Sequence, residues 1–363
     1  MERIDVAVIG AGVTGLAAAR AIAGRGRTVV LLERHPRAGQ DTSTHNSGVI
    51  HAGMYYPSGS LKARLCVDGR RRLYDFCAQH GVPHRKCGKL IVGHDAAEMQ
   101  QLEALKARGE ANGVEGLAIV DRSFIVDREP AVDAPVALWS PETGIVEAEA
   151  LVRALLRTGQ DAGVLFLPGT PLVAAERRDT GVLLRTAQED ILAAAVVNAA
   201  GLYADEVSRT LQGERFTIYP CRGEYVALSP AKRSIVNGLV YPLPHVHSLG
   251  VHIVKTLNGD VWLGPTARFQ DRKDDYESDR LPIEAFVEPA RRLLRGITVD
   301  DLRLGGSGIR PKLHSPAETF ADFMNRRDRV NPFVVQASGI ESPGLTSCLA
   351  VGQMVAEIVE EHP

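Results

Sequence analysis

The chain has 363 residues, of which 45% are hydrophobic, and its formal net charge is −2 at pH 7. This size and apolar content allow a large core, in one large domain or in two interleaved ones. The small net charge excludes a broad cationic field for nucleic acid or an anionic membrane. We expect no signal peptide, because no charged n-region precedes an apolar h-region. We also expect no transmembrane segment, because no apolar run approaches the roughly 18 residues that a span requires.

Five cysteines are scattered along the chain without a CxxC pair. Their odd number and their spacing predict reduced thiols, and argue against both a disulfide framework and a metal site. Together with the expected lack of a membrane segment, this predicts a cytoplasmic protein, with peripheral contact to the inner membrane left open.

The first predicted elements form a βαβ unit. Ile4–Ile9 is a short apolar run that predicts a buried strand, and Thr28–Glu33 predicts a second one. Leu16–Arg25, between them, is rich in alanine and predicts a helix. Two parallel strands joined in this way imply a right-handed crossover.

The turn after the first strand carries a GxGxxG motif, made of Gly10, Gly12 and Gly15, and Glu33 ends the second strand. The three glycines permit a tight turn, a close approach to a pyrophosphate and close packing of helix on strand. The helix N-terminus offers free N–H groups to phosphates, and Glu33 can accept ribose hydroxyls. The unit predicts a dinucleotide site, which NAD and FAD share.

Helical and strand patterns alternate after this unit. Helices are predicted at Leu61–His80, Ala96–Gly113 and Glu147–Gln160, with a strand at Lys89–Gly93. Residues 171–201 alternate strands and turns, which predicts a three-stranded insertion on one face of a nucleotide-binding sheet.

The second half of the chain is strand-rich. The pattern from about Arg215 to Gly264 predicts a mostly antiparallel sheet in a second domain. A helix at Leu281–Leu294, a buried strand at 331–339 and a last helix at Leu345–Glu360 follow. The predicted fold class is α/β: a Rossmann-like domain with a parallel sheet, and an α+β substrate domain with a mostly antiparallel sheet. We assign residues 1–80, 145–212 and 305–363 to the first domain, and residues 81–144 and 213–304 to the second.

Several blocks resemble known families. The N-terminal fingerprint, "VVNAAGLYAD", "GGSGIRP" and "ASGIESPGLTSCLAVG" resemble FAD-dependent oxidoreductases of the D-amino-acid oxidase superfamily. Within it, "HNSGVIHAGMYYPSGSLKARLCVDG", "CGKLIVG", "CRGEYVAL" and "LGVHIVKTLNGDVWLGPTA" resemble the L-2-hydroxyglutarate dehydrogenase family. The resemblance spans nearly the whole chain and implies an FAD-dependent dehydrogenase.

The implied reaction is the oxidation of an L-2-hydroxy acid, most nearly L-2-hydroxyglutarate, to the 2-oxo acid. The implied electron acceptor is a quinone or an electron-transfer protein. An amine or amino-acid oxidase of the same superfamily is the alternative, because it shares the FAD scaffold. An NAD-dependent dehydrogenase does not account for the C-terminal block.

Such a reaction needs a base for the hydroxyl proton and a cation for the carboxylate. His51 is the favoured base, because a neutral imidazole accepts a proton near pH 7, and His252 is its rival. Arg310 is the candidate for the carboxylate, since guanidinium binds it bidentately and keeps its charge in a dry site. Weaker candidates for the far end of the substrate are Tyr56, Tyr241, Lys255 and Lys62, while His245 and His247 are expected in a loop.

The resemblance also implies contacts with FAD along the whole chain. They begin in the fingerprint, continue through the polar segment that follows it, and end at the last helix. The residues implied are Gly10, Gly12, Gly15, Glu33, Arg34, Thr42, Ser43, His45, Asn46, Ser47, Val173, Ala200, Gly201, Gly339, Ile340, Gly344, Leu345 and Thr346.

Overall fold

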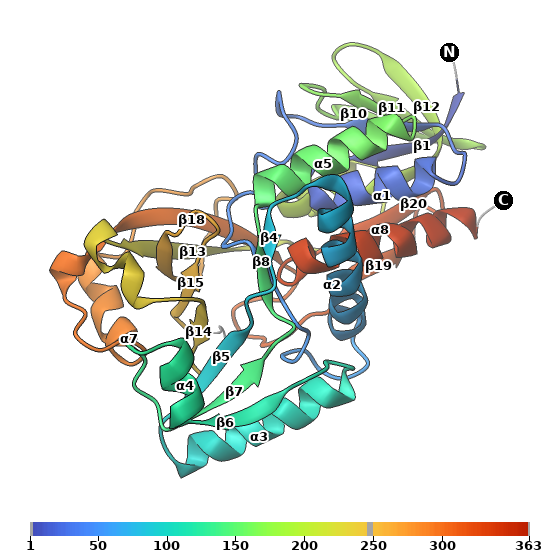
Figure 1. The fold of residues 1–363 in the computed structure, drawn as a ribbon. Coiled ribbons are helices and arrows are strands. Elements are labelled where there is room, and N and C mark those ends of the chain that lie inside the picture. Colours follow the sequence, from blue (N-terminus) through green and yellow to red (C-terminus); the bar gives the residue numbers. More distant parts are fainter. Residues whose placement is uncertain (1–2, 245–249, 362–363) are drawn as a thin grey trace.

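The computed structural model describes residues 3–244 and 250–361, so His245 and His247 lie outside the described residues. Within the described residues, two large sheets form the body of the molecule, and Figure 1 shows them toward opposite ends of it. The predicted α/β fold class is confirmed.

The nucleotide-binding sheet is built around β1 (Arg3–Ile9). This strand pairs in parallel with β2 (Val29–Leu32) on one side and with β12 (Asp190–Asn198) on the other. The sheet continues in parallel from β2 to β9 (Leu165–Leu167) and from β12 to β20 (Val334–Ser338). The predicted βαβ unit is therefore confirmed, together with the return of the C-terminal segment to this sheet.

Strand β12 is long enough to have two neighbours on one edge. Its first half pairs antiparallel with β11 (Gly181–Arg185), which pairs with β10 (Ala174–Arg178), and its second half pairs with β20. The three predicted strands are present, but they do not lie on one face of the sheet as predicted: β12 pairs directly with β1, and β11 and β10 extend the same sheet at its edge. β20 pairs in turn with β19 (Met324–Arg327).

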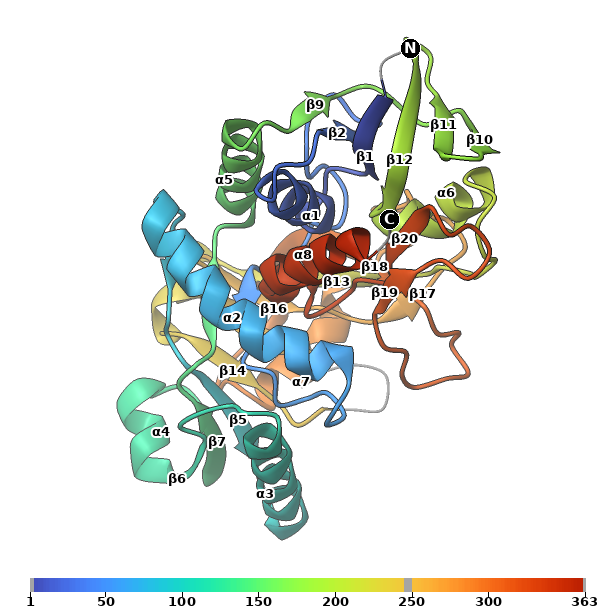
Figure 2. The same cartoon turned by 90° about the vertical axis from the view of Figure 1, so that its right-hand side faces the viewer.

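The helices of this region include α1 (Val13–Ala23), α2 (Leu61–His80) and α5 (Ala148–Asp161). The last helix, α8 (Gly344–Glu360), packs against both α1 and α2, and Figures 1 and 2 show the three close together.

Small residues permit this close packing of α8. A Cβ added to Gly352 would lie 2.6 Å from the Ala17 backbone of α1. One added to Gly69 of α2 would lie 2.5 Å from the Cα atom of Ser347. These contacts fix the position of the α8 N-terminus relative to the nucleotide sheet.

The second sheet is mostly antiparallel, as predicted, apart from the parallel pair of β14 and β5. Its longest pairing joins β13 (Tyr219–Leu228) to β18 (Leu302–Lys312). Residue 305 lies inside β18, so this strand crosses the boundary that the sequence suggested. The other strands are β5 (Lys89–Gly93), β6 (Ala118–Asp121), β7 (Val136–Ser140), β14 (Leu239–Tyr241), β15 (His252–Lys255), β16 (Val261–Gly264) and β17 (Arg268–Phe269).

A small third sheet contains β3 (Val49–Ile50), β8 (Gly144–Val146) and β4 (His84–Arg85). The predicted helix over 96–113 is α3 (Ala96–Ala111), and the Asp95 side chain caps its N-terminus.

The helix predicted at Leu281–Leu294 is wrong in extent. The α-helix, α7, covers only Val287–Arg291, after a 3-10 turn at Ile283–Phe286. Pro289 explains the late start, since proline fits only the first turn of a helix. The short helices α4 (Arg122–Arg128) and α6 (Ala204–Thr210) were not predicted.

All five cysteines are free thiols. No helix in the described part of the chain is long and apolar enough to cross a membrane. The cytoplasmic location stays a prediction.

Candidate active site

A cavity of about 410 Å³ opens between the two large sheets, with wall residues from both. Most of the residues that the sequence singled out meet on this wall. They are Gly12, Thr42, Ser43, His45, Asn46, Ser47, His51, Tyr56, Gly201, Tyr241, His252, Arg310, Ile340, Gly344 and Leu345. The others lie off the wall, and they are Gly10, Gly15, Glu33, Arg34, Val173, Ala200, Gly339, Thr346 and Lys255.

The turn between β1 and α1 has the tight geometry that its glycines predict. Gly10 has a φ of +99°, and a Cβ on Gly15 would collide with the Gly10 carbonyl oxygen. Glu33 accepts one hydrogen bond from the Ala11 amide at 2.7 Å and one from the His35 amide at 2.9 Å. A carboxylate has about four acceptor positions, so Glu33 keeps capacity for ribose hydroxyls.

Two of the predicted contacts lie farther out along the nucleotide sheet. Arg34 lies 3.7 Å from the ring centre of Tyr203 and donates to Asp41 at 2.8 Å. Val173 is exposed, and its amide donates to the Arg185 carbonyl at 2.9 Å. This amide is therefore not available to an adenine ring.

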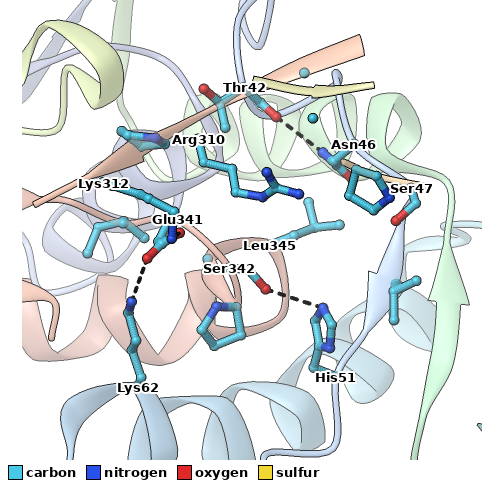
Figure 3. A pocket seen from close by; sticks show the side chains of 18 of the residues that line it. Thr42, Asn46, Ser47, His51, Lys62, Arg310, Lys312, Glu341, Ser342 and Leu345 are labelled. Carbon is cyan, nitrogen blue, oxygen red and sulfur yellow. Dashed lines mark hydrogen bonds and ion pairs between the residues drawn. The ribbon is translucent and has the colours of Figure 1, made fainter. Parts of the chain in front are cut away.

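The polar segment of residues 41–47, the cofactor loop, holds its own side chains in place (Figure 3). Asn46 Nδ2 donates to the carbonyls of Thr42 at 3.2 Å and Ser43 at 2.8 Å. Thr42 Oγ1 donates to the Ile309 carbonyl of β18 at 2.9 Å, and Ser43 Oγ accepts the Val13 amide at 3.0 Å. The loop thus joins the start of α1 to the second sheet.

Two helix N-termini reach the cavity, and neither has an N-cap residue whose own side chain caps the helix. The N-cap residue of α1 is Gly12 and that of α8 is Pro343, and both line the wall. Uncapped N-termini present N–H groups and a partial positive charge to bound anions or carbonyl oxygens. An elongated dinucleotide fits this arrangement, with its pyrophosphate at α1 and its ring system near α8.

Arg310 extends from β18 toward the middle of the cavity (Figure 3). Its Nη1 donates to the Thr266 carbonyl at 3.3 Å. Among the described residues no carboxylate forms an ion pair with it. Its guanidinium is therefore available to an anionic ligand.

His51 lies opposite, at the end of β3. Its amide donates to Thr346 Oγ1 at 2.9 Å, and its Nε2 lies 3.4 Å from Ser342 Oγ. Its Nδ1 is buried without a hydrogen-bond partner in the described structure. Burial and the nearby charge of Lys89 lower the pKa of His51 to about 3, so its imidazole is neutral at pH 7.

His252 lines the same cavity from β15. Its ring stacks on Tyr241 with 3.8 Å between the ring centres, and its Nδ1 lies 3.1 Å from the Gly250 carbonyl. Burial, Lys89, His51 and Arg310 all lower its pKa well below the usual range, while the Gly250 carbonyl opposes them.

Lys255 points away from the cavity, contrary to the expectation for the substrate's far end. Its Nζ donates to the Val236 carbonyl at 2.6 Å. Strand alternation is the reason, because His252 and Lys255 are three residues apart on β15 and so face opposite sides of the sheet.

Lys62, Glu341 and Lys312 form a buried triad on the cavity wall. Glu341 bonds to Lys62 at 2.8 Å and to Lys312 at 2.9 Å (Figure 3). Burial acts against ionisation of Glu341, but the two lysines outweigh it and lower the carboxyl pKa to about 2. The triad ties α2, β18 and the loop before α8 together.

Comparisons with known proteins agree with this site. The family model described as DAO, FAD dependent oxidoreductase, matches residues 5–358. The chain belongs to this family. It is 36% identical to the mitochondrial L-2-hydroxyglutarate dehydrogenase of Arabidopsis thaliana, over 98% of this chain and 83% of that one. It is 30% identical to the human enzyme of that name, over 99% of this chain and 89% of that one.

Solved structures show the same fold. L-alpha-glycerophosphate oxidase from Mycoplasma pneumoniae, with FAD bound, superposes with a TM-score of 0.90 at 26% identity, over 99% of this chain and 95% of that one. Glycine oxidase from Geobacillus kaustophilus superposes with a TM-score of 0.83 at 20% identity, over 100% of this chain and 96% of that one.

FAD is therefore the cofactor of this protein, as predicted. The residues fit it, because the glycine turn, the cofactor loop and the two uncapped helices line one continuous cavity. We propose that they hold the cofactor in that order, from its adenosine to its flavin ring.

Sequence reasoning missed several wall residues and one residue behind the wall. Glu341, Ser342 and Tyr55 lie inside the blocks that carry the family resemblance, but nothing in those blocks singled them out. Lys89 did carry a signal, since it stands at the start of the predicted strand "KLIVG", which is otherwise apolar. A lysine in a buried strand requires an explanation.

Proposed function

We propose that the protein oxidises L-2-hydroxyglutarate to 2-oxoglutarate, as an FAD-dependent dehydrogenase. The observation that carries this proposal is Arg310, a guanidinium on the cavity wall with no carboxylate partner among the described residues. The similarity to relatives named L-2-hydroxyglutarate dehydrogenase supports it over nearly the full length of the chain.

In this proposal Arg310 binds the carboxylate beside the reacting carbon. Two parallel N–H···O bonds from a planar guanidinium fix both the position and the orientation of a carboxylate. Bound FAD supplies the hydride acceptor. The arginine then determines which carbon of the substrate faces the flavin, and positioning of this kind lowers the barrier substantially.

His51 accepts the hydroxyl proton in this proposal. Its neutral imidazole is ready to take a proton, and its contacts with Thr346 and Ser342 hold it beside the start of α8. Lys89 disfavours the imidazolium form in the free protein. The negative charge of a bound substrate opposes that effect, so base strength rises when substrate is present.

Anaerobic mixing of the purified flavoprotein with L-2-hydroxyglutarate tests the proposal. We expect the flavin absorbance to bleach and 2-oxoglutarate to accumulate in equal amount. A flavin that L-2-hydroxyglutarate leaves oxidised, and that glycerol 3-phosphate or another hydroxy acid bleaches, would show that the substrate is wrong.

A peroxide assay with glycine, sarcosine and D-amino acids tests the amine-oxidase alternative, and we expect no peroxide above background. We also propose a quinone or an electron-transfer protein as the acceptor. Reoxidation of the reduced flavin by a soluble quinone analogue should be faster than by oxygen.

A further inference from the structure

Three buried polar groups in one corner of the cavity have no hydrogen-bond partner in the described structure. They are Lys89 Nζ and the hydroxyls of Tyr55 and Tyr241. Both tyrosines line the cavity, as do His51 and His252, and Tyr241 stacks on His252. Lys89 is 1% exposed and is not itself a wall residue.

Lys89 contacts the two tyrosines directly. Its Nζ lies 4.5 Å from the ring centre of Tyr55 and 4.3 Å from that of Tyr241. Cation–π contacts of this kind compensate only part of the cost of removing an ammonium group from water. Lys89 begins β5, whose five residues are all buried, so a methionine would satisfy the packing at less cost.

The other buried lysines on this cavity each have a carboxylate partner. Lys62 and Lys312 share the carboxylate of Glu341, so their triad carries one net positive charge. Lys89 and Arg310 have no such carboxylate, and the charges of both bear on His252. Two uncompensated cations that act on one imidazole from different strands match a ligand with two negative charges.

We propose that the hydroxyls of Tyr55 and Tyr241 bind the second, distal carboxylate of the substrate. Lys89 is the positioning residue, and its positive charge beside the two rings favours an anion at their hydroxyls. This inference rests on the proposed function and extends it, because it assigns the residues that select a dicarboxylic over a monocarboxylic 2-hydroxy acid. Arg310 serves the carboxylate that both classes share.

Substrate pairs of equal length provide the first test. Wild-type protein and the Lys89→Met variant are compared with L-2-hydroxyglutarate and with L-2-hydroxyvalerate, which lacks the distal carboxylate. We expect the variant to raise KM for the dicarboxylate by about ten- to a hundredfold and to leave the KM for L-2-hydroxyvalerate within about threefold. Because Lys89 also acts on His51, any change in kcat should be the same for both substrates. An equal rise in KM for both substrates, or no change in KM, would overturn the proposal.

Matched variants isolate the groups involved. Tyr55→Phe and Tyr241→Phe keep the rings and should each raise KM for the dicarboxylate alone. Arg108 is the rival cation, because it is exposed and also lines the cavity. If Arg108→Met weakens dicarboxylate binding and Lys89→Met does not, Lys89 has no part in selection.

The pH dependence of ligand binding distinguishes the proposed role of Lys89 from a purely structural one, because a purely structural lysine would not make the Kd depend on pH. Burial lowers the pKa of Lys89 to about 7. Other groups that face Lys89 stay in one form from pH 6 to 9: burial raises the pKa of Cys66, Cys87, Tyr55 and Tyr241, and lowers that of His51 and His252.

Binding of glutarate, followed by the absorbance change of bound flavin, should therefore weaken as pH rises above about 7. The Lys89→Arg variant keeps its charge and should bind glutarate with little dependence on pH. A pH-independent wild-type Kd, or equal affinity for glutarate and butyrate, would overturn the inference. Binding of glutarate and butyrate is measured without turnover. A negative result for Lys89 is therefore distinguishable from a failure of the proposed function, which the flavin reduction by L-2-hydroxyglutarate tests.

Discussion

The two ends of the cavity, the cofactor loop and the substrate end, differ in whether their polar side chains have hydrogen-bond partners within the protein. In the cofactor loop, the side chains of Thr42, Ser43 and Asn46 all have hydrogen-bond partners within the protein. At the substrate end, which we define as His51, Tyr55, Tyr241, His252 and Lys89, four of the five residues carry a buried polar atom without one. The polar side chains of the cofactor loop are satisfied within the protein, whereas those of the substrate end need a ligand to provide their hydrogen-bond partners.

This difference follows from what each end must do. A tightly held cofactor needs a rigid wall, and hydrogen bonds within the loop provide rigidity before the cofactor arrives. A substrate must be selected, and unpaired polar groups penalise every ligand that cannot satisfy them. The predictions below perturb one end or the other.

The largest effect is expected for His51→Gln. Loss of a general base lowers the rate of the chemical step by about 10²–10⁴-fold, measured as anaerobic flavin reduction in a stopped-flow instrument. His252→Gln is the matched control at the same end and should slow reduction much less. If His252→Gln slows flavin reduction much more than His51→Gln does, His252 is the base.

Arg310→Gln should lower kcat/KM by about 30- to 4,000-fold, the range expected when one partner of a buried charge pair is truncated. Flavin content, read from the absorbance spectrum, should stay unchanged. Arg303→Gln is the control, since Arg303 is exposed on the same strand. Loss of flavin from the Arg310 variant would assign this arginine to the cofactor instead.

Glu341→Gln should lower the free energy of unfolding by about 3–5 kcal/mol at pH 7, because it leaves two buried lysines without their anion. The folded-state pKa of Glu341 is lowered to about 2, from a usual 4.5. The stabilisation is therefore complete above pH 4.5 and is lost as pH falls toward 2. Denaturant unfolding measures the difference in free energy of unfolding between the wild type and the variant, and this difference should be smaller at pH 3 than at pH 7.

Lys89→Met should stabilise the protein while it weakens substrate binding. The folded-state pKa of about 7 lies below the usual 10.5, so the folded state resists a proton that the unfolded chain binds. The free energy of unfolding of the variant should exceed that of the wild type by on the order of a few kcal/mol below pH 7. This difference should shrink as pH rises from 7 toward 10.5. Thermal unfolding at pH 6.5 and pH 9.5 measures it, and a destabilised variant would contradict the prediction.

The smallest effect is expected for Ser342→Ala, which removes the hydroxyl 3.4 Å from His51 Nε2. One neutral hydrogen bond contributes about 0.5–1.5 kcal/mol, so flavin reduction should slow by about two- to tenfold. Ser347→Ala, in the first turn of α8, serves as the comparison and should leave the rate unchanged.

Local signals in the sequence were sufficient for the βαβ unit. The strand, the GxGxxG turn and the alanine-rich helix each predict their own geometry, whereas the contacts of the cofactor loop with FAD came from the family resemblance and stay a prediction. The same local logic failed for the helix at Leu281–Leu294, where one proline decided the start.

The substrate end could not be assembled in this way, because its members come from distant parts of the chain. Lys89 and Tyr241 meet only through the parallel pairing of β5 and β14, which no local pattern specifies. Lys255 shows the reverse error, since it lies near His252 in sequence but on the opposite face of the same strand.

Strand β18 places Arg310 and, through Ile309, also holds the cofactor loop. The residues proposed to select the substrate stand on other strands, β5 and β14, and on the segment after β3. The cation proposed for the shared carboxylate and the residues proposed for the distal one therefore stand on separate strands, while the segment after β3 supplies both His51 and Tyr55. Changes at Lys89, Tyr55 or Tyr241 can redirect the enzyme to a different acid while the distance from Arg310 to the cofactor stays as it is.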